Sequence, residues 1–78
     1  MNAKSAADDP AMVQVRQLWE EKRADGWTQQ KLGEAMGYTG DSARKSVNQF
    51  LKSRNPQISM LRRFAYAVGV ALSTIVRE

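Results

Sequence analysis

Side chains that could read another molecule gather on one face of the segment from Asp41 to Ser53. At about 100° per residue along a helix, this face is polar and carries mostly hydrogen-bond donors. Its members are Lys45, Asn48, Gln49 and Lys52, with Asp41 and Ser42 near its start and Arg44 at its flank. Arginine and lysine pair with O6 and N7 of guanine, and asparagine and glutamine pair with N6 and N7 of adenine. Since a helix of about 10–12 Å diameter fits the major groove, the pattern is typical of a base-reading helix; its alternative is an ordinary solvated face.

Positions near this segment could hold phosphate groups. Thr28 and Gln29 lie at the predicted start of another helix, where free N–H groups and the positive end of the helix dipole favour an anion. Lys52, Arg54 and Asn55 lie at the end of the polar segment or just after it, and could hold neighbouring phosphates. Such contacts set affinity and register but carry little sequence information.

The sequence lacks the residues on which most catalytic and metal sites depend. It has no histidine and no cysteine, which removes the commonest general base, the thiol nucleophile and the usual zinc ligands. Its adjacent carboxylates, Asp8-Asp9 and Glu20-Glu21, are sequence neighbours and would not face each other on a helix. We therefore expect neither an enzyme nor a bound cofactor or metal.

Length and charge narrow the class of partner. The 78 residues allow one domain, and 12 Lys and Arg against 8 Asp and Glu give a net charge of +4. This excess favours a polyanion, with DNA, RNA and an anionic membrane as candidates. No run of about 18 apolar residues is present, and Met1 to Asp9 has no apolar stretch of a signal peptide. We expect a cytoplasmic protein that does not enter a membrane.

Caps and helix-breaking residues predict five helices after a disordered tail at residues 1–8. The first has Asp9 as N-cap and Pro10 as its first residue, and ends near Ala24 to Gly26; the second runs from the N-cap Thr28 to Gly37; the third starts at a cap at Asp41 or Ser42 and breaks at Arg54-Asn55-Pro56; the fourth runs from the cap Ser59 to Gly69; the fifth covers about residues 72–77. Strand-like alternation is nowhere sustained, so the predicted fold class is all-α.

Apolar residues recur every three or four positions in each predicted helix and should form one buried stripe per helix. The stripes contain Met12, Val15, Leu18, Trp19, Leu32, Ala35, Met36, Ala43, Val47, Phe50, Leu51, Met60, Leu61, Phe64, Ala65, Val68, Leu72, Ile75 and Val76. Gly33 interrupts the second helix at a cost of about 1 kcal/mol relative to alanine. A glycine there predicts that another helix passes too close to leave room for a side chain.

Three stretches in order carry a family resemblance. Trp27 to Gly37 (WTQQKLGEAMG) is similar to a Thr-Gln-x-x-Leu-Ala-x-x-x-Gly scanning helix and turn. Val47 to Lys52 (VNQFLK) is similar to the second half of a recognition helix. Asn55-Pro56, followed by Met60 to Val70 (MLRRFAYAVGV), is similar to Asn-Pro and a Leu-x-x-Leu-Ala-x-Ala-Leu-Gly-Val segment. Over about residues 10–77 the chain resembles the phage repressor and Cro family of helix-turn-helix domains, also called the XRE family.

The resemblance implies a fold, a function and a set of contact residues. The fold is a compact five-helix bundle of the lambda-repressor-like type, spanning residues 9–78. The function is that of a sequence-specific double-stranded DNA-binding transcriptional regulator, a repressor or Cro-like protein, with residues 41–53 as recognition helix. With Val47 as anchor, the family's base-contacting positions fall on Arg44, Lys45 and Gln49, and Gln29 falls near the DNA backbone. Members usually bind as homodimers; an apolar dimer surface around Leu72, Ile75 and Val76 is one expectation, and closure of the core by these residues is the other.

The chain departs from the family in two places. Gly33 stands where the family usually has alanine. The family's core Val or Ile follows the turn glycine by about six residues, whereas Val47 lies ten residues after Gly37 and Ala43 lies six after it. Either the recognition helix has an extra N-terminal turn or the loop is about four residues longer, or else Ala43 itself fills the position. The first reading is preferred, because Val47, Phe50 and Leu51 make a better apolar face.

Two other functions remain open at this point. A DNA-binding antitoxin would use the same domain and also neutralise a toxin protein. A protein-interaction module could have kept the fold and lost DNA binding, since a fold does not fix a function.

Overall fold

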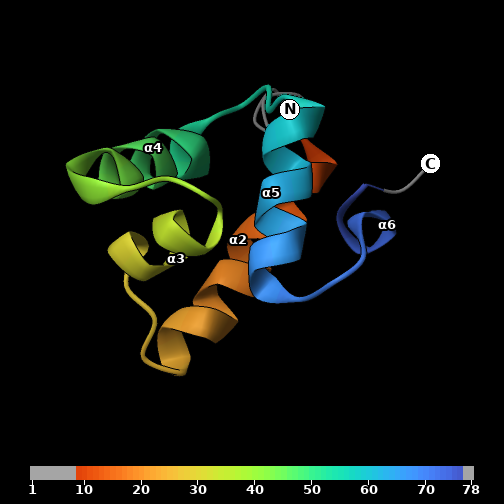
Figure 1. The fold of residues 1–78 in the computed structure, drawn as a ribbon. Coiled ribbons are helices and arrows are strands. Elements are labelled where there is room, and N and C mark those ends of the chain that lie inside the picture. The colour runs from red at the N-terminus through yellow and green to blue at the C-terminus, as the bar shows by residue number, and fades with distance from the viewer. Residues whose placement is uncertain (1–8, 77–78) are drawn as a thin grey trace.

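The computed structural model describes residues 9–76, and the predicted tail at residues 1–8 lies outside them. Within the described range the structure has five helices and no strand: α2 (Pro10–Ala24), α3 (Gln29–Ala35), α4 (Gly40–Lys52), α5 (Ile58–Val68) and α6 (Leu72–Ile75). Figure 1 shows α2 and α5 in the middle of the molecule, with α3 and α4 on one side and α6 on the other. The all-α prediction is confirmed.

The first two helices begin where their capping residues predict. The Asp9 carboxylate accepts a hydrogen bond from the backbone N–H of Ala11 at 2.8 Å, and Pro10 is the first helical residue of α2. The Thr28 hydroxyl accepts a hydrogen bond from the backbone N–H of Lys31 at 3.1 Å at the start of α3. These bonds satisfy N–H groups that the first turn of a helix leaves without a partner.

The predicted caps of the next two helices are wrong. Helix α4 is capped by Thr39, whose backbone is extended, and not by Asp41 or Ser42. Gly40, the first residue of α4, has a φ of 60°, which a glycine adopts readily. Helix α5 is capped by Gln57 and not by Ser59, and again no side chain makes the cap. In both cases extended backbone at the cap is enough to start the helix.

The early start of α4 decides between two of the predicted alternatives. After Gly37 only two residues precede the helix, so the loop is short and the additional residues are helical. The longer-loop alternative is therefore wrong. Ala43 and Val47 are both fully buried, at 0% exposure, so α4 contributes both positions to the interior.

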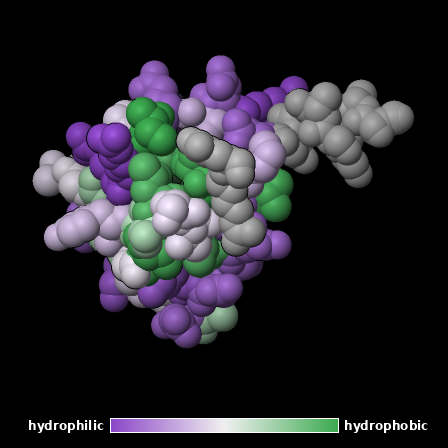
Figure 2. Space-filling view, turned by 90° about the vertical axis from the view of Figure 1, so that its right-hand side faces the viewer, coloured by the Kyte–Doolittle hydropathy of each residue, from purple (hydrophilic) through white to green (hydrophobic). Residues whose placement is uncertain are grey.

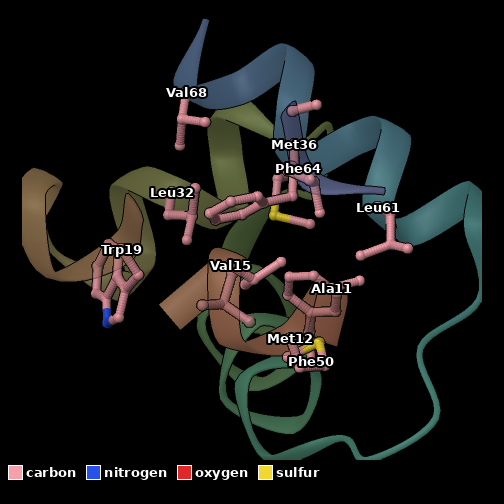
Figure 3. Close-up of a cluster of buried hydrophobic side chains, with 13 residues drawn as sticks. Ala11, Met12, Val15, Trp19, Leu32, Met36, Phe50, Leu61, Phe64 and Val68 are labelled. Atoms are coloured by element: carbon pink, nitrogen blue, oxygen red, sulfur yellow. The ribbon is translucent and has the colours of Figure 1, made fainter. Parts of the chain in front are cut away.

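Side chains from all five helices form the core. Figure 3 shows Met12 and Val15 of α2, Leu32 of α3, Phe50 of α4 and Phe64 of α5, and all five are buried. The rings of Phe50 and Phe64 are 5.7 Å apart and tilted by 45°. The apolar stripes predicted from the sequence supply nearly all of this core; Ala11 is an addition, and Ala35, Leu18, Leu51 and Met60 are only partly buried.

Helices α3 and α4 cross in close contact at Gly33, as the glycine predicts. A Cβ placed on Gly33 would lie 2.6 Å from the carbonyl carbon of Ala43 and 2.8 Å from its Cβ, and closer still to its carbonyl oxygen. Two of these three atoms belong to the backbone, so no side-chain rotation would relieve the overlap. The alanine common in the resembled family would not fit here without moving α4.

Helix α6 closes the core on the side away from α4. Ile75 is 1% exposed, and Leu72 and Val76 are partly buried against the same core. Ile75 therefore follows the second of the two expectations, closure of the core, and is not a surface residue. Figure 2, which views the side that carries α6, shows apolar side chains gathered at the centre of this face among more hydrophilic ones.

Candidate nucleic-acid interface

The polar face of α4 turns outward because its other face is buried. Ala43, Val47 and Phe50 fix the inward side of the helix. On the outward side, Arg44, Lys45, Gln49 and Lys52 are exposed and Asn48 is partly buried. We call these five residues the reading face. Its position at one edge of the molecule, opposite α6, leaves it open to a large partner (Figure 1).

The structure brings together most of the residues predicted to contact DNA. One open concavity is lined by Gln29, Arg44, Lys45, Asn48, Gln49 and Lys52. This set contains all four predicted base-reading residues and two of the five predicted phosphate-binding residues. Gln29 is the first residue of α3. The start of α3 therefore forms one side of the concavity, and α4 forms the other.

The cations of the reading face make no ion pair within the part of the chain that the structure describes. Within residues 9–76, no carboxylate lies at ion-pair distance from Arg44, Lys45 or Lys52. The ion pair that the described range does contain joins Arg23 to Glu20 at 3.2 Å, on α2. An unpaired cationic row attracts an anionic partner and can neutralise its charge directly.

The remaining predicted phosphate-binding residues lie around the concavity and not in it. Thr28 precedes Gln29 and uses its oxygen to cap α3, which leaves its O–H able to donate. Arg54 and Asn55 are exposed in the loop after α4, where the backbone N–H of Asn55 donates to the Ser53 hydroxyl at 3.2 Å. Asn55 lines a second concavity together with Gln49, so the loop continues the same surface past the end of α4.

Arg16 holds the end of α4 in place, and sequence reasoning missed it. Its Nε donates to the carbonyl of Leu51 at 3.2 Å, and its Nη2 donates to the carbonyl of Ser53 at 3.3 Å. The Leu51 carbonyl belongs to the last turn of α4, where the negative end of the helix dipole favours a cation, and Ser53 is the C-cap residue that follows. The signal in the sequence was the place of Arg16 on α2, four residues after the buried Met12 and three before the buried Trp19.

Gln30 joins α3 to the first turn of α4. Its side-chain amide donates to the carbonyl of Gly40 at 3.0 Å and to the Glu34 carboxylate at 2.9 Å. Together with the close contact at Gly33, this bond fixes the start of α4 relative to α3. The two ends of the reading face are therefore held by different elements, α3 at the start and α2 at the end.

Contacts around two aromatic residues, Tyr38 and Trp27, support the frame behind the reading face. The Arg63 guanidinium donates to the carbonyl of Met36 at 3.4 Å and lies 5.3 Å from the centre of the Tyr38 ring, so α5 holds the turn between α3 and α4. Trp27 is partly buried, with the ammonium groups of Lys22 and Lys31 5.0 Å and 5.1 Å from the centre of one of its rings. Both aromatic rings are thus engaged within the fold.

Comparisons of the chain with protein-family models, with curated proteins and with solved structures gave no match in any of the three. The resemblance to the phage repressor and Cro family is therefore carried by the quoted motifs alone. In the described range no helix is both long enough and apolar enough to cross a membrane.

Proposed function

We propose that the protein is a sequence-specific double-stranded DNA-binding transcriptional regulator, a repressor or Cro-like protein with a lambda-repressor-like helix-turn-helix fold. Helix α4 enters the major groove, and α3 lies across the DNA backbone. The observation that carries the proposal is the reading face: five donor side chains in a continuous outward row, without carboxylate partners in residues 9–76.

The dimensions of α4 suit this role. Its 13 residues span about 20 Å at 1.5 Å per residue, and a helix of about 10–12 Å diameter fits a major groove about 12 Å wide. Because α4 meets the rest of the protein through its buried side alone, the outward side can approach base edges along its length. The hydrogen bonds from Gln30 and Arg16 hold both ends and limit rocking of the helix in the groove.

The side chains divide into two tasks. Arg44 and Lys45 pair with guanine O6 and N7, while Asn48 and Gln49 pair with adenine N6 and N7. The phosphate contacts come from Thr28, Gln29, Lys52, Arg54 and Asn55. They lie at the start of α3, at the last residue of α4 and in the loop that follows it.

A homodimer bound to two half-sites belongs to the proposal. A single α4 reads only a few base pairs, and two-fold protein symmetry would match a palindromic site with half-sites about one helical turn apart. The apolar side chains on the α6 face, apart from the buried Ile75, offer one surface for such pairing (Figure 2).

Selection from a random duplex library, followed by affinity measurements over a range of salt, tests the proposal. We expect an enriched sequence with two-fold symmetry, and a log affinity that falls linearly with log salt at a slope of about −0.9 for each phosphate neutralised. Arg62→Ala is the control variant, because it removes an exposed arginine of α5 that does not line the concavity. It should select the same sequence with the same salt slope. Absence of binding to any duplex at low salt, or binding without salt dependence, would reject the proposal in favour of a protein-interaction module.

A further inference from the structure

Asp41 continues the row of the reading face by one turn. Asp41, Lys45, Asn48 and Lys52 follow one another at intervals of four, three and four residues. At about 100° per residue these positions fall in a straight line along the helix. The last three line the concavity described above, and Asp41 lies in the first turn of α4 with its side chain exposed. An anion therefore stands at the start of a row that is otherwise cationic or amidic.

Neither capping nor ion pairing accounts for Asp41 at this position. Thr39, and not Asp41, is the N-cap of α4. Within residues 9–76 the structure gives the Asp41 carboxylate no ion pair with Lys45 or Arg44, although both are at helical spacing from it. A carboxylate anywhere in the first turn would favour the positive end of the helix dipole, so the dipole does not require the charge to stand in this row.

The chemistry of a carboxylate in the major groove is selective. It accepts hydrogen bonds and donates none, and it is repelled by phosphate groups and by other acceptors. Guanine offers O6 and N7, and thymine offers O4, all of them acceptors; adenine places an acceptor, N7, beside its N6 amino group. Cytosine presents the N4 amino donor alone, and Asp or Glu accepting from this group is a known pairing type. A wrong base thus meets repulsion as well as a lost bond, which raises discrimination.

Resting on the proposed function, we propose that Asp41 is a specificity-determining residue that accepts a hydrogen bond from the N4 amino group of a cytosine. This cytosine lies at the end of the half-site that meets the first turn of α4. The carboxylate also lowers affinity for random DNA, because it stands among the cations of the row. Asp41 sharpens the choice of site at the expense of overall attraction.

The test uses library selection with the full chain and three variants. Asp41→Ala removes the carboxylate. The double variant Asp41→Ala with Thr39→Asp keeps a carboxylate at the start of the helix, at the N-cap, but takes it out of the row. Glu21→Gln is the control, because it removes one exposed carboxylate from α2. Circular dichroism checks that each variant keeps its helices.

We expect the unaltered chain and the Glu21→Gln control to prefer cytosine about tenfold at one position of each half-site. Both Asp41 variants should lose that preference to within about twofold while preferences elsewhere persist, and Asp41→Ala should bind random duplex several times more tightly at low salt. The same selected sequence from Asp41→Ala, or a cytosine preference kept after the carboxylate moves to position 39, would overturn the assignment. The unaltered chain is measured first. If it selects no sequence, the proposed function fails, and the role of Asp41 fails with it. If it selects a sequence, the variants test the role of Asp41 alone.

Discussion

Replacing Gly33 with alanine tests how closely α3 and α4 approach. For a helical glycine, propensity alone predicts that alanine stabilises the fold by about 0.5–1 kcal/mol. Here the new Cβ would lie 2.6 Å and 2.8 Å from the carbonyl carbon and the Cβ of Ala43, against an ordinary contact distance of about 3.5–4.0 Å. Helix α4 would have to move away by nearly 1 Å, and forcing an extra carbon into a packed interior costs about 1–3 kcal/mol.

The gain in helix propensity and the cost of the overlap have opposite signs, and the cost of the overlap is the larger free energy. We expect Gly33→Ala to lower the free energy of unfolding by about 1–2 kcal/mol, which for a domain of this size corresponds to a fall in Tm of about 4–8 °C per kcal/mol. Urea and thermal unfolding followed by circular dichroism measure both quantities. Because two of the three closest atoms are backbone atoms, adding Ala43→Gly should restore little of the lost stability.

The sign of the change in stability shows whether α3 and α4 are as close at Gly33 as the structure places them. If Gly33→Ala unfolds at the same or a higher temperature than the unaltered chain, the gain in helix propensity is at least as large as the cost of the overlap. Helices α3 and α4 are then not as close at Gly33 as the structure places them. A full rescue by Ala43→Gly would show that only the Ala43 side chain stands in the way, and that the backbone of α4 lies farther from α3 than the structure places it.

Other substitutions test the reading face and its supports. Gln49→Ala should lower affinity for the selected duplex by about 1–3 kcal/mol and relax the preference at one base pair, as measured by fluorescence anisotropy; equal losses on selected and random DNA would mean that Gln49 does not read a base. Lys52→Ala and Arg54→Ala should each weaken binding to all duplexes alike and reduce the salt slope by about 0.9, and an unchanged slope would remove that residue from the phosphate contacts. Arg16→Met should lower the free energy of unfolding by about 1–3 kcal/mol, because it leaves the carbonyls of Leu51 and Ser53 without the guanidinium. The exposed arginine control Arg62→Met should change stability by less than about 0.5 kcal/mol, and similar losses for both would mean that the capping bonds contribute nothing.

The helices and the buried faces could be predicted because their signals are local. Asp9, Pro10 and Thr28 mark helix starts through their own chemistry, and apolar spacing marks the inward side of each helix. The starts of α4 and α5 could not be predicted in this way. There the backbone makes the cap, through extended conformations at Thr39 and Gln57, and no side chain announces it.

In the candidate site, too, the residues with a local signal could be predicted and the others could not. The outward row of Lys45, Asn48 and Gln49 follows from periodicity, since residues opposite a buried face must point outward. The residues that hold α4 could not be predicted, because they act across the fold. Arg16 reaches carbonyls 35 and 37 residues away in sequence, and Arg63 reaches one 27 residues away. Backbone carbonyls at helix ends attract such donors wherever the fold brings them near, and their partners appear only once the helices are packed.

If the proposed function is right, duplex DNA meets the protein through the outward face of α4. Amide chemical shifts of the nitrogen-15-labelled chain, followed during titration with the selected duplex, test it directly. We expect the largest changes in α4 from Arg44 to Lys52 and at the start of α3, while any changes in α6 would report pairing of two copies of the chain on the duplex. Changes concentrated on α6 and the exposed side of α5, with α4 unaffected, would contradict the account.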